Sequence, residues 1–324
     1  MEKTKIRKIY GLMVLGAFLC FLPSIGLSQP CTATVVGGSS YPSINAALNA
    51  AGPFATINVS GTCNEIVQIL ANKNHITLNG GGTATITCQS PAIPPNVCAT
   101  QGNVAILGKS ITITAFNITG GIAGIQVVQG ASATINSNTI YDTARNGIVV
   151  VQNSFASIIN NTIHDIGLDP NFPFRGGIQV ADSSSAYIGY SRPTDTVASP
   201  NIIRNNPTGI LLRSSASARI VGNEIINNAG DGIMVIRGSQ ADISDNIIDG
   251  NGQNGIFVSQ GSGVNLGNDT GDTILDLPNS GTNGDKGLSC SIGGYVDGRL
   301  GALKGTGKHH ATKFTKGCID SLIP

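Results

Sequence analysis

The chain of 324 residues is 11% charged, with a formal net charge of +1 at pH 7. Once the expected export signal at its start is set aside, 15 basic and 17 acidic residues remain. This near-neutral balance argues against a nucleic-acid partner, because binding to phosphate requires a basic surface. The length is compatible with one continuous domain if the chain folds as a repeat protein.

Residues 1–28 have the pattern of a secretion signal rather than of a folded element. A basic start precedes an apolar run from Leu12 to Leu22, and Gly26-Leu27-Ser28 is a small-x-small cleavage site. The basic residues are Lys3, Lys5, Arg7 and Lys8. The apolar run is too short for a confident membrane span, so we expect no span in the mature chain. The sequence therefore predicts a secreted, periplasmic or cell-surface protein.

Six cysteines remain after this segment, an even number that favours disulfides in an exported chain. Six thiols allow 15 connectivities. Proximity in sequence favours the pairs Cys31–Cys63, Cys88–Cys98 and Cys290–Cys318. The spacing of a CxxC redox or zinc site is absent, so no metal is expected at the cysteines.

A short helix is predicted just before the first strands. Ser43 can cap its N-terminus and Gly52 can end it. The apolar face comprises Ile44, Ala47, Leu48 and Ala51. A solenoid exposes core side chains at its end, and this helix is the candidate cap.

One short phrase, Gly-Ile-x-Val or a near copy, returns six times between Gly124 and Ser259. Its glycines lie 23, 30, 32, 23 and 23 residues apart. Two further aliphatic positions follow each phrase, so that every period holds three short apolar segments cut by Gly, Asn, Ser or Asp. The six phrase isoleucines are Ile125, Ile148, Ile178, Ile210, Ile233 and Ile256. This pattern predicts a β-solenoid in which the isoleucines stack inside.

Asparagines also recur in register, fourteen residues after most of the phrase glycines. They are Asn138, Asn161, Asn223 and Asn246, with Asn201 in the same place once an insertion is removed. An Asn can bind a sugar, but its turn preferences and its ability to hydrogen-bond along a stack favour a structural ladder.

With these repeats, the chain resembles the right-handed parallel β-helix superfamily, which includes pectate lyases, polygalacturonases, pectin methylesterases and periplasmic NosD-type repeat proteins. The resemblance implies an all-β, single-stranded right-handed parallel β-helix running from about Thr56 to Leu266. We expect a β-helix domain over 29–278, with regular coils over 124–266, and an irregular disulfide-containing tail over 279–324. The scaffold hosts many activities and so implies no single function.

Reactive and charged side chains gather at one corner when the coils are aligned. They are Tyr141-Asp142 and His164-Asp165 after the third strand, and Arg145 and Arg175 two residues before Gly147 and Gly177. An insertion over residues 167–176, with Phe172 and Phe174, would overhang this corner. A second insertion spans residues 190–200.

Two interpretations of this corner stay open. A lyase or epimerase acting on a uronate needs a base, for which His164 or Tyr141 would serve, and a cation on the carboxylate, for which Arg145 or Arg175 would serve. The ligand-binding residues would be Asp142, Asp165, Phe172 and Phe174. In the alternative, the aspartates cap turns and the arginines pair with them at the surface. This alternative is favoured because ordinary ion-pair networks gather the same residue types as functional sites do.

The enzymatic signatures of the resembled families are absent, including a Gly-His-Gly turn with paired aspartates and an Arg-x-Pro-x-x-Arg motif. The sequence therefore favours an exported β-helix protein that interacts with polysaccharide, over a lyase or epimerase and over a purely structural or adhesive repeat. No cofactor is expected. Residues 268–272 would suit calcium, although a plain turn is favoured over a calcium site.

The outward column of the first strand turns apolar in its last three coils, at Leu211, Met234 and Phe257. A contiguous exposed apolar surface usually marks an interface or a covered face. Burial under the C-terminal tail is the favoured explanation, and an oligomer contact is the second.

Overall fold

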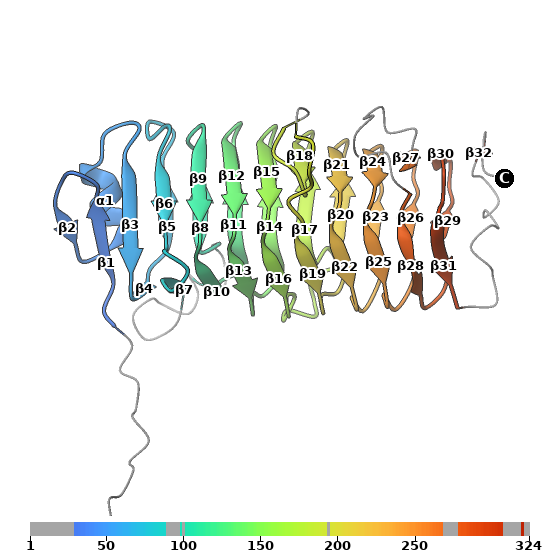
Figure 1. Ribbon diagram of the computed structural model, residues 1–324, viewed down its shortest axis with the longest axis horizontal. Helices are drawn as coiled ribbons and strands as arrows, with labels where there is room; N and C mark the ends of the chain where they lie inside the picture. Colours follow the sequence, from blue (N-terminus) through green and yellow to red (C-terminus); the bar gives the residue numbers. More distant parts are fainter. Residues whose placement is uncertain are drawn as a thin grey trace, which may run out of the picture.

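The protein is a single-chain parallel β-helix, seen in a computed structural model that describes residues 29–88, 98, 101–192, 195–267, 278–306 and 319–320 (Figure 1). Each coil passes through three sheets in the order C, B, A. Strands of neighbouring coils pair in parallel and in register, and such crossovers are right-handed. The expected right-handed parallel β-helix is confirmed.

Among the described residues, the three sheets contain 10, 13 and 9 strands. Sheet A comprises β4 (Thr62–Asn64), β7 (Thr85–Cys88), β10 (Asn117–Gly120), β13 (Thr139–Tyr141), β16 (Thr162–His164), β19 (Ile202–Arg204), β22 (Glu224–Ile226), β25 (Ile247–Asp249), β28 (Ser280–Asn283) and β31 (Ala302–Gly305). Sheet B comprises β1 (Thr32–Val35), β2 (Ser40–Tyr41), β3 (Thr56–Ser60), β6 (Thr77–Asn79), β9 (Ile111–Thr114), β12 (Ser132–Asn136), β15 (Phe155–Ile159), β18 (Ser185–Ile188), β21 (Ser217–Val221), β24 (Gln240–Ser244), β27 (Gly263–Leu266), β30 (Tyr295–Gly298) and β32 (Ile319–Asp320). Sheet C comprises β5 (Val67–Ile69), β8 (Val104–Ile106), β11 (Ala123–Val127), β14 (Asn146–Val150), β17 (Gly176–Ala181), β20 (Ile210–Arg213), β23 (Ile233–Val235), β26 (Ile256–Val258) and β29 (Leu288–Cys290).

The core is built from columns of aliphatic side chains that stack from coil to coil. The six phrase isoleucines lie in sheet C and are all fully buried, which confirms their predicted inward orientation. The glycines of the repeated phrase are required because there is no space for a side chain at their positions. A Cβ on Gly209 would lie 2.4 Å from the carbonyl oxygen of Gly232 in the next coil, and one on Gly232 would lie 2.7 Å from that of Gly255. Adjacent coils approach too closely here for any side chain.

The asparagine ladder is confirmed, with a change in which residue makes the turn. The five predicted asparagines are almost fully buried, and each Nδ2 donates to the Oδ1 of the asparagine in the next coil at 2.8–3.1 Å. The left-handed conformation belongs to the residue before the asparagine in four of the five cases, as at Ser137 (φ 56°) and Asn160 (φ 55°), whereas Pro200 precedes Asn201. A second ladder at the next turn comprises Asn206, Asn228, Asn251 and Asn283.

Helix α1 (Ile44–Ala50) closes the N-terminal end of the coil, as predicted, with Ile44, Ala47 and Leu48 buried. The Ser43 Oγ accepts from the Ala46 backbone N–H at 3.1 Å, which confirms the expected N-cap. The helix ends at the C-cap Ala51, one residue before Gly52. Beside the helix, β1 pairs antiparallel with β2 and β3, whereas the other described strand pairs are parallel.

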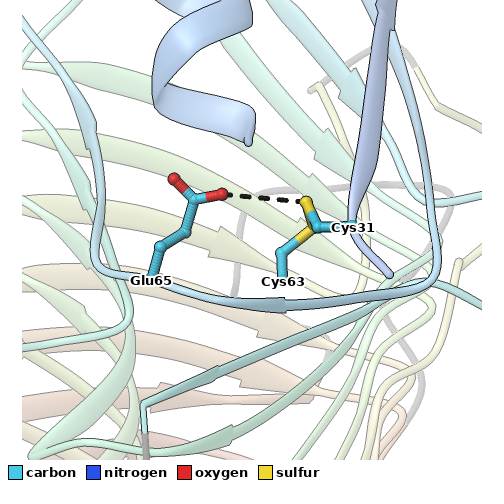
Figure 2. Close-up of side chains that lie close together, drawn as sticks. All are labelled: Cys31, Cys63 and Glu65. Atoms are coloured by element: carbon cyan, nitrogen blue, oxygen red, sulfur yellow. Dashed lines mark hydrogen bonds between the residues drawn. A yellow bond between two sulfur atoms is a disulfide. The ribbon is translucent and has the colours of Figure 1, made fainter. Parts of the chain in front are cut away.

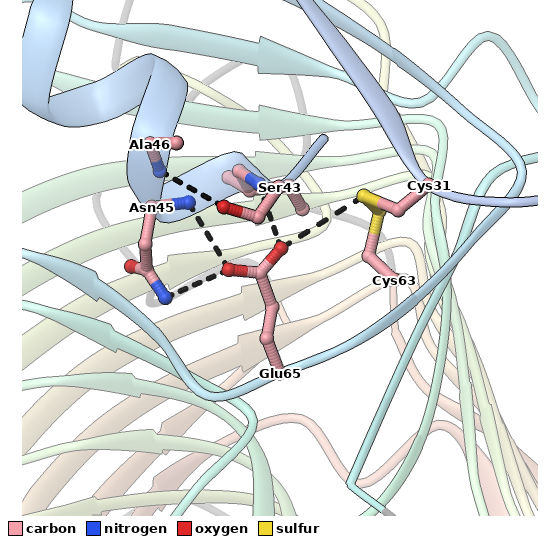
Figure 3. Close-up of a disulfide and its surroundings, with 7 residues drawn as sticks. Cys31, Ser43, Asn45, Ala46, Cys63 and Glu65 are labelled. Atoms are coloured by element: carbon pink, nitrogen blue, oxygen red, sulfur yellow. Dashed lines mark hydrogen bonds between the residues drawn. A yellow bond between two sulfur atoms is a disulfide. The ribbon is translucent and has the colours of Figure 1, made fainter. Parts of the chain in front are cut away.

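Glu65 joins this cap to the first coil (Figure 3). Its carboxylate accepts from the backbone N–H groups of Ile44 at 2.6 Å and Asn45 at 3.1 Å, and from the Asn45 side chain at 2.8 Å. A carboxylate at a helix N-terminus satisfies N–H groups that have no partner within the helix. The Cys31 sulfur lies 3.8 Å from the same carboxylate (Figure 2). That sulfur is in a disulfide and carries no hydrogen, so the approach is a contact and not a hydrogen bond.

Two of the three expected disulfides are present, Cys31–Cys63 and Cys88–Cys98. The first fastens the residue before β1 to β4, and the second closes the loop that follows β7. Cys290 is also disulfide-bonded, but Cys318 lies outside the described residues, so that pairing stays a prediction.

Parallel pairing continues beyond Leu266, where the sequence period fades. Strands β28 to β31 pair in register with the preceding coils, and Leu288, Val296 and Leu303 are buried. The predicted end of the coils near Leu266 is therefore too early. The residues of the signal segment and of the predicted calcium turn, 268–272, lie outside the described residues.

Candidate functional site

Parallel register brings three of the candidate side chains into one outward column of sheet A. Tyr141 in β13 pairs with His164 in β16, which pairs with Arg204 in β19. The Tyr141 and His164 rings are stacked, with centroids 5.5 Å apart and planes 5° from parallel. The three side chains are half-buried, and they form a stack of two rings with a cation at one end.

His164 and Asp165 form a close pair at the end of β16. The His164 Nδ1 and Asp165 Oδ2 atoms are 2.7 Å apart. The hydrogen bond with His164 lowers the pKa of Asp165, against the opposing effect of burial, and the charge of Arg204 acts in the same direction as the hydrogen bond. Asp142 and Asp165 each adopt a left-handed turn conformation, with φ of 53° and 55°. The pair orients the imidazole, while both aspartates also serve as turn residues.

Arg145 pairs with Asp169 of the first insertion, whereas the favoured alternative expected it to pair with Asp142 or Asp165. Its Nε lies 3.4 Å from Asp169 Oδ2, and its guanidinium lies 4.4 Å from the centre of the Phe172 ring. Arg145 is about one third exposed. An ion pair combined with a cation–π contact holds the insertion against the turn before β14.

Arg175 fixes the other end of the same insertion. Its Nη1 donates to the Gly167 carbonyl oxygen at 2.7 Å, which closes the loop at its base. Phe174 lies between two cations of later coils, 5.1 Å from the Arg213 guanidinium and 4.8 Å from that of Arg237. The insertion therefore contacts the end of β20 and the turn that follows β23.

The predicted corner thus consists of two clusters. Tyr141, His164, Asp165 and Arg204 form the sheet A cluster, and Arg145, Asp169 and Phe172 form the loop cluster. Arg204 was not selected from the sequence. Aligning Asn201 with Asn161 places Ile203 on Ile163 and Arg204 on His164, so that alignment could have found it.

The apolar column that suggested an oligomer contact is largely covered. Leu211 is 2% exposed and Val149 is 7% exposed, while Met234 and Phe257 are half-buried. The burial of Leu211 agrees with the favoured expectation of a covered face, and an oligomer contact through Met234 and Phe257 stays a prediction. Within the tail expected to cover it, residues 279–306 continue the coil through β28 to β31, and residues 307–318 and 321–324 lie outside the described residues.

One buried carboxylate lies away from both clusters. Asp231 is 2% exposed, and its Oδ1 accepts from the backbone N–H of Asn254 at 2.9 Å and from the Asn254 side chain at 2.7 Å. Burial raises the pKa of Asp231 above its ordinary value of 3.8, and the charge of Asp285 adds to the rise. The two hydrogen bonds oppose this shift without cancelling it.

Asp231→Asn should therefore stabilise the protein at neutral pH. The folded-state pKa is raised, so the wild type loses stability as the pH rises above the unfolded value of 3.8, and the loss persists at neutral pH. An amide oxygen keeps both bonds without the charge. Melting temperatures measured between about pH 3 and pH 7 should show a gap that widens with pH. The exposed control Asp142→Asn should show no such widening, and a constant gap for Asp231→Asn would contradict the explanation.

Comparison with known proteins gives a family. The family model for periplasmic copper-binding protein (NosD) matches residues 102–273, slightly more than half of the chain. No curated protein matches the chain. Among solved structures, the chain is similar to an alginate lyase from Paenibacillus sp. str. FPU-7, with 15% identity, coverage of 85% of this chain and 95% of that chain, and a TM-score of 0.49. It is also similar to a mannuronan C-5 epimerase A-module from Azotobacter vinelandii, with 13% identity, coverage of 86% of both chains and a TM-score of 0.47.

Proposed function

We propose a binding function for this chain, which belongs to the family of periplasmic copper-binding proteins (NosD). It binds an anionic, uronate-containing polysaccharide at the sheet A cluster. The protein is exported, and its disulfides Cys31–Cys63 and Cys88–Cys98 agree with an oxidising compartment. Within the described residues, the structure has no helix that is long and apolar enough to cross a membrane.

The observation that carries the proposal is the Tyr141–His164 stack followed by Arg204 in the same column. The apolar atoms of the two rings offer contact area to a sugar, and a guanidinium forms paired hydrogen bonds with a carboxylate. Neighbouring coils repeat at about 4.8 Å, so the three side chains can contact one ligand together. A stacking surface beside a cation suits a sugar acid better than a neutral sugar.

The family name implies copper, but the described part of the chain has no set of side chains suited to bind it. Copper sites use His, Cys and Met side chains. The group of three potential ligands found among the described residues is Cys31, Cys63 and Glu65, and both of its thiols are consumed in the disulfide. His75 stacks on Phe54 and His164 stacks on Tyr141, in different parts of the coil. These residues do not fit a copper centre.

The binding proposal is tested by titrating the protein with polygalacturonate and with alginate in a calorimeter. The double variant His164→Ala/Arg204→Ala should weaken binding by at least about tenfold, because it removes the stacking surface and its cation. Arg192→Ala, whose side chain is 74% exposed on the second insertion, is the matched control and should bind like the wild type. Equal affinities of the wild type and the double variant would place the polyuronate elsewhere.

Arg145→Ala/Arg175→Ala tests the contribution of the loop cluster. These two arginines hold both ends of the insertion, so we expect weaker polyuronate binding if the loop covers the ligand.

A lyase is the second candidate function, and the His164–Asp165 pair favours it as an oriented base. Its product would carry a new conjugated double bond, so an increase in ultraviolet absorbance on incubation with polyuronate would distinguish catalysis from binding.

A further inference from the structure

The outward face of sheet B has two hollows that the polyuronate site does not include. The first, of about 250 Å³, is lined by Ser110, Thr112, Ser132, Ala133, Thr134 and Phe155. The second, of about 190 Å³, is lined by residues of β18, β21 and β24, among them Tyr187, Arg219 and Asp242. The strands that line them are consecutive in the sheet, in the order β9-β12-β15-β18-β21-β24 (Figure 1).

The hollows arise from the register of small and large side chains. Ser185 and Ser217 are paired in one outward column, while Tyr187, Arg219 and Asp242 follow one another in the next. The short serines leave space beside the taller column. In the first hollow, hydroxyl side chains of β9 and β12 take the place of the serines and Phe155 forms the far wall.

An aromatic cluster joins the two hollows. Phe155, which lines the first, packs edge-on against Tyr187, which lines the second, with ring centroids 5.2 Å apart and planes at 86°. Tyr187 in turn stacks at 4.8 Å on Tyr190, which is fully buried. Tyr190 begins the second insertion, whose Ser191 carbonyl oxygen accepts from the Ser157 hydroxyl of β15 at 2.9 Å. The insertion therefore packs on the outward side of sheet B beside Tyr187. A ligand that spans both hollows would cross this aromatic ridge.

The charges in the hollows are balanced. Arg219 and Asp242 are the charged residues that line them, and Arg219 Nε lies 3.1 Å from Asp242 Oδ2. The other oxygen of Asp242 accepts from the Asn265 side chain at 2.9 Å. The ion pair supplies polar groups without a net charge, in contrast to the cation at the sheet A cluster.

We propose that this face of sheet B is a second binding site, for a neutral linear oligosaccharide lying along the axis of the coil. Hydroxyl side chains both donate and accept hydrogen bonds, as sugar hydroxyls require, and the aromatic ridge offers apolar area to the sugar rings. Six strands at about 4.8 Å spacing extend over roughly 24 Å, which matches an elongated ligand better than a single sugar. The balanced charge selects against polyuronate.

Variants that fill the hollows test the site without removing a packed side chain. Ser217→Phe fills the second hollow from an exposed position, and Thr134→Phe fills the first from a half-buried one. Ser60→Phe introduces the same ring at an exposed position of β3, in the same sheet but outside the hollows, and is the matched control. The probes are cellohexaose, xylohexaose, mannohexaose and maltohexaose, measured by calorimetry.

At least one of these hexasaccharides should bind the wild type, and each filled variant should bind it at least about tenfold more weakly, because the added ring occupies the space of the ligand. Ser60→Phe and the His164→Ala/Arg204→Ala variant should bind it like the wild type. The proposal is overturned if none of the probes binds, if the filled variants bind unchanged, or if the sheet A variant abolishes binding of the neutral probe. The sheet A cluster is tested with polyuronate and the sheet B site with neutral hexasaccharides. A negative result for one site therefore leaves the proposal for the other site unaffected.

Discussion

Replacing Ile210 with aspartate should lower the free energy of unfolding by at least about 4 kcal/mol, because it buries a charge that has no partner. Ile210 is fully buried in β20, between Ile178 of the preceding coil and Ile233 of the following one. For a domain of this size, the loss corresponds to a fall in melting temperature of roughly 10 °C. Thermal denaturation followed by circular dichroism measures it.

Ile247→Asp is the matched control for this variant. Ile247 lies in β25 with its side chain outward, and it is 52% exposed. The same change of chemistry there should alter stability by no more than about 0.5 kcal/mol. If Ile210→Asp melted like Ile247→Asp, the phrase isoleucine would not face the core.

The repeated positions of the fold were predictable because one steric rule acts on every coil. The isoleucine column, the ladder at Asn223 and the N-cap Ser43 were each identified from spacing and side-chain chemistry. The coil of β28 to β31 was not identified, since Leu288, Val296 and Leu303 keep the inward column while the phrase around them is lost. An inward position requires only that its residue be apolar. The sequence of the surrounding turns can vary, so the repeated phrase can be lost while the coil continues.

The candidate site was less predictable because insertions break the register from which side-chain neighbours are inferred. Alignment placed Tyr141 and His164 at matching positions, because no insertion separates them, and the structure shows their rings stacked there. It did not give the partners of Arg145, because Asp169 and Phe172 belong to an insertion whose path no repeat specifies. The hollows on sheet B were not predicted from the sequence, because neither Ser217 nor Arg219 indicates a binding site by itself. The hollow that they line forms only when the strands pair.

The asparagine ladder supports the second large expected effect. Asn223 is 1% exposed, and its Oδ1 accepts from the backbone N–H of Asn201 at 3.1 Å and from the Asn201 side chain at 2.8 Å. Its Nδ2 donates to the carbonyl oxygens of Ile188 and Val221 and to the Oδ1 of Asn246, at 2.9–3.0 Å. One amide thus satisfies buried polar groups of three successive coils.

Asn223→Leu should therefore cost about 3–5 kcal/mol, since each buried donor or acceptor left without a partner costs about 1–3 kcal/mol and part of the loss is offset by the apolar side chain. The matched control is Asn58→Leu, because Asn58 is exposed and accepts a single 3.2 Å bond from Asn79 at the surface. Urea denaturation of the three proteins measures the difference. A loss for Asn223→Leu no larger than that for Asn58→Leu would mean that the ladder follows from the coil geometry without stabilising it. A large loss for Asn223→Leu alone would show that the buried amides hold successive coils together.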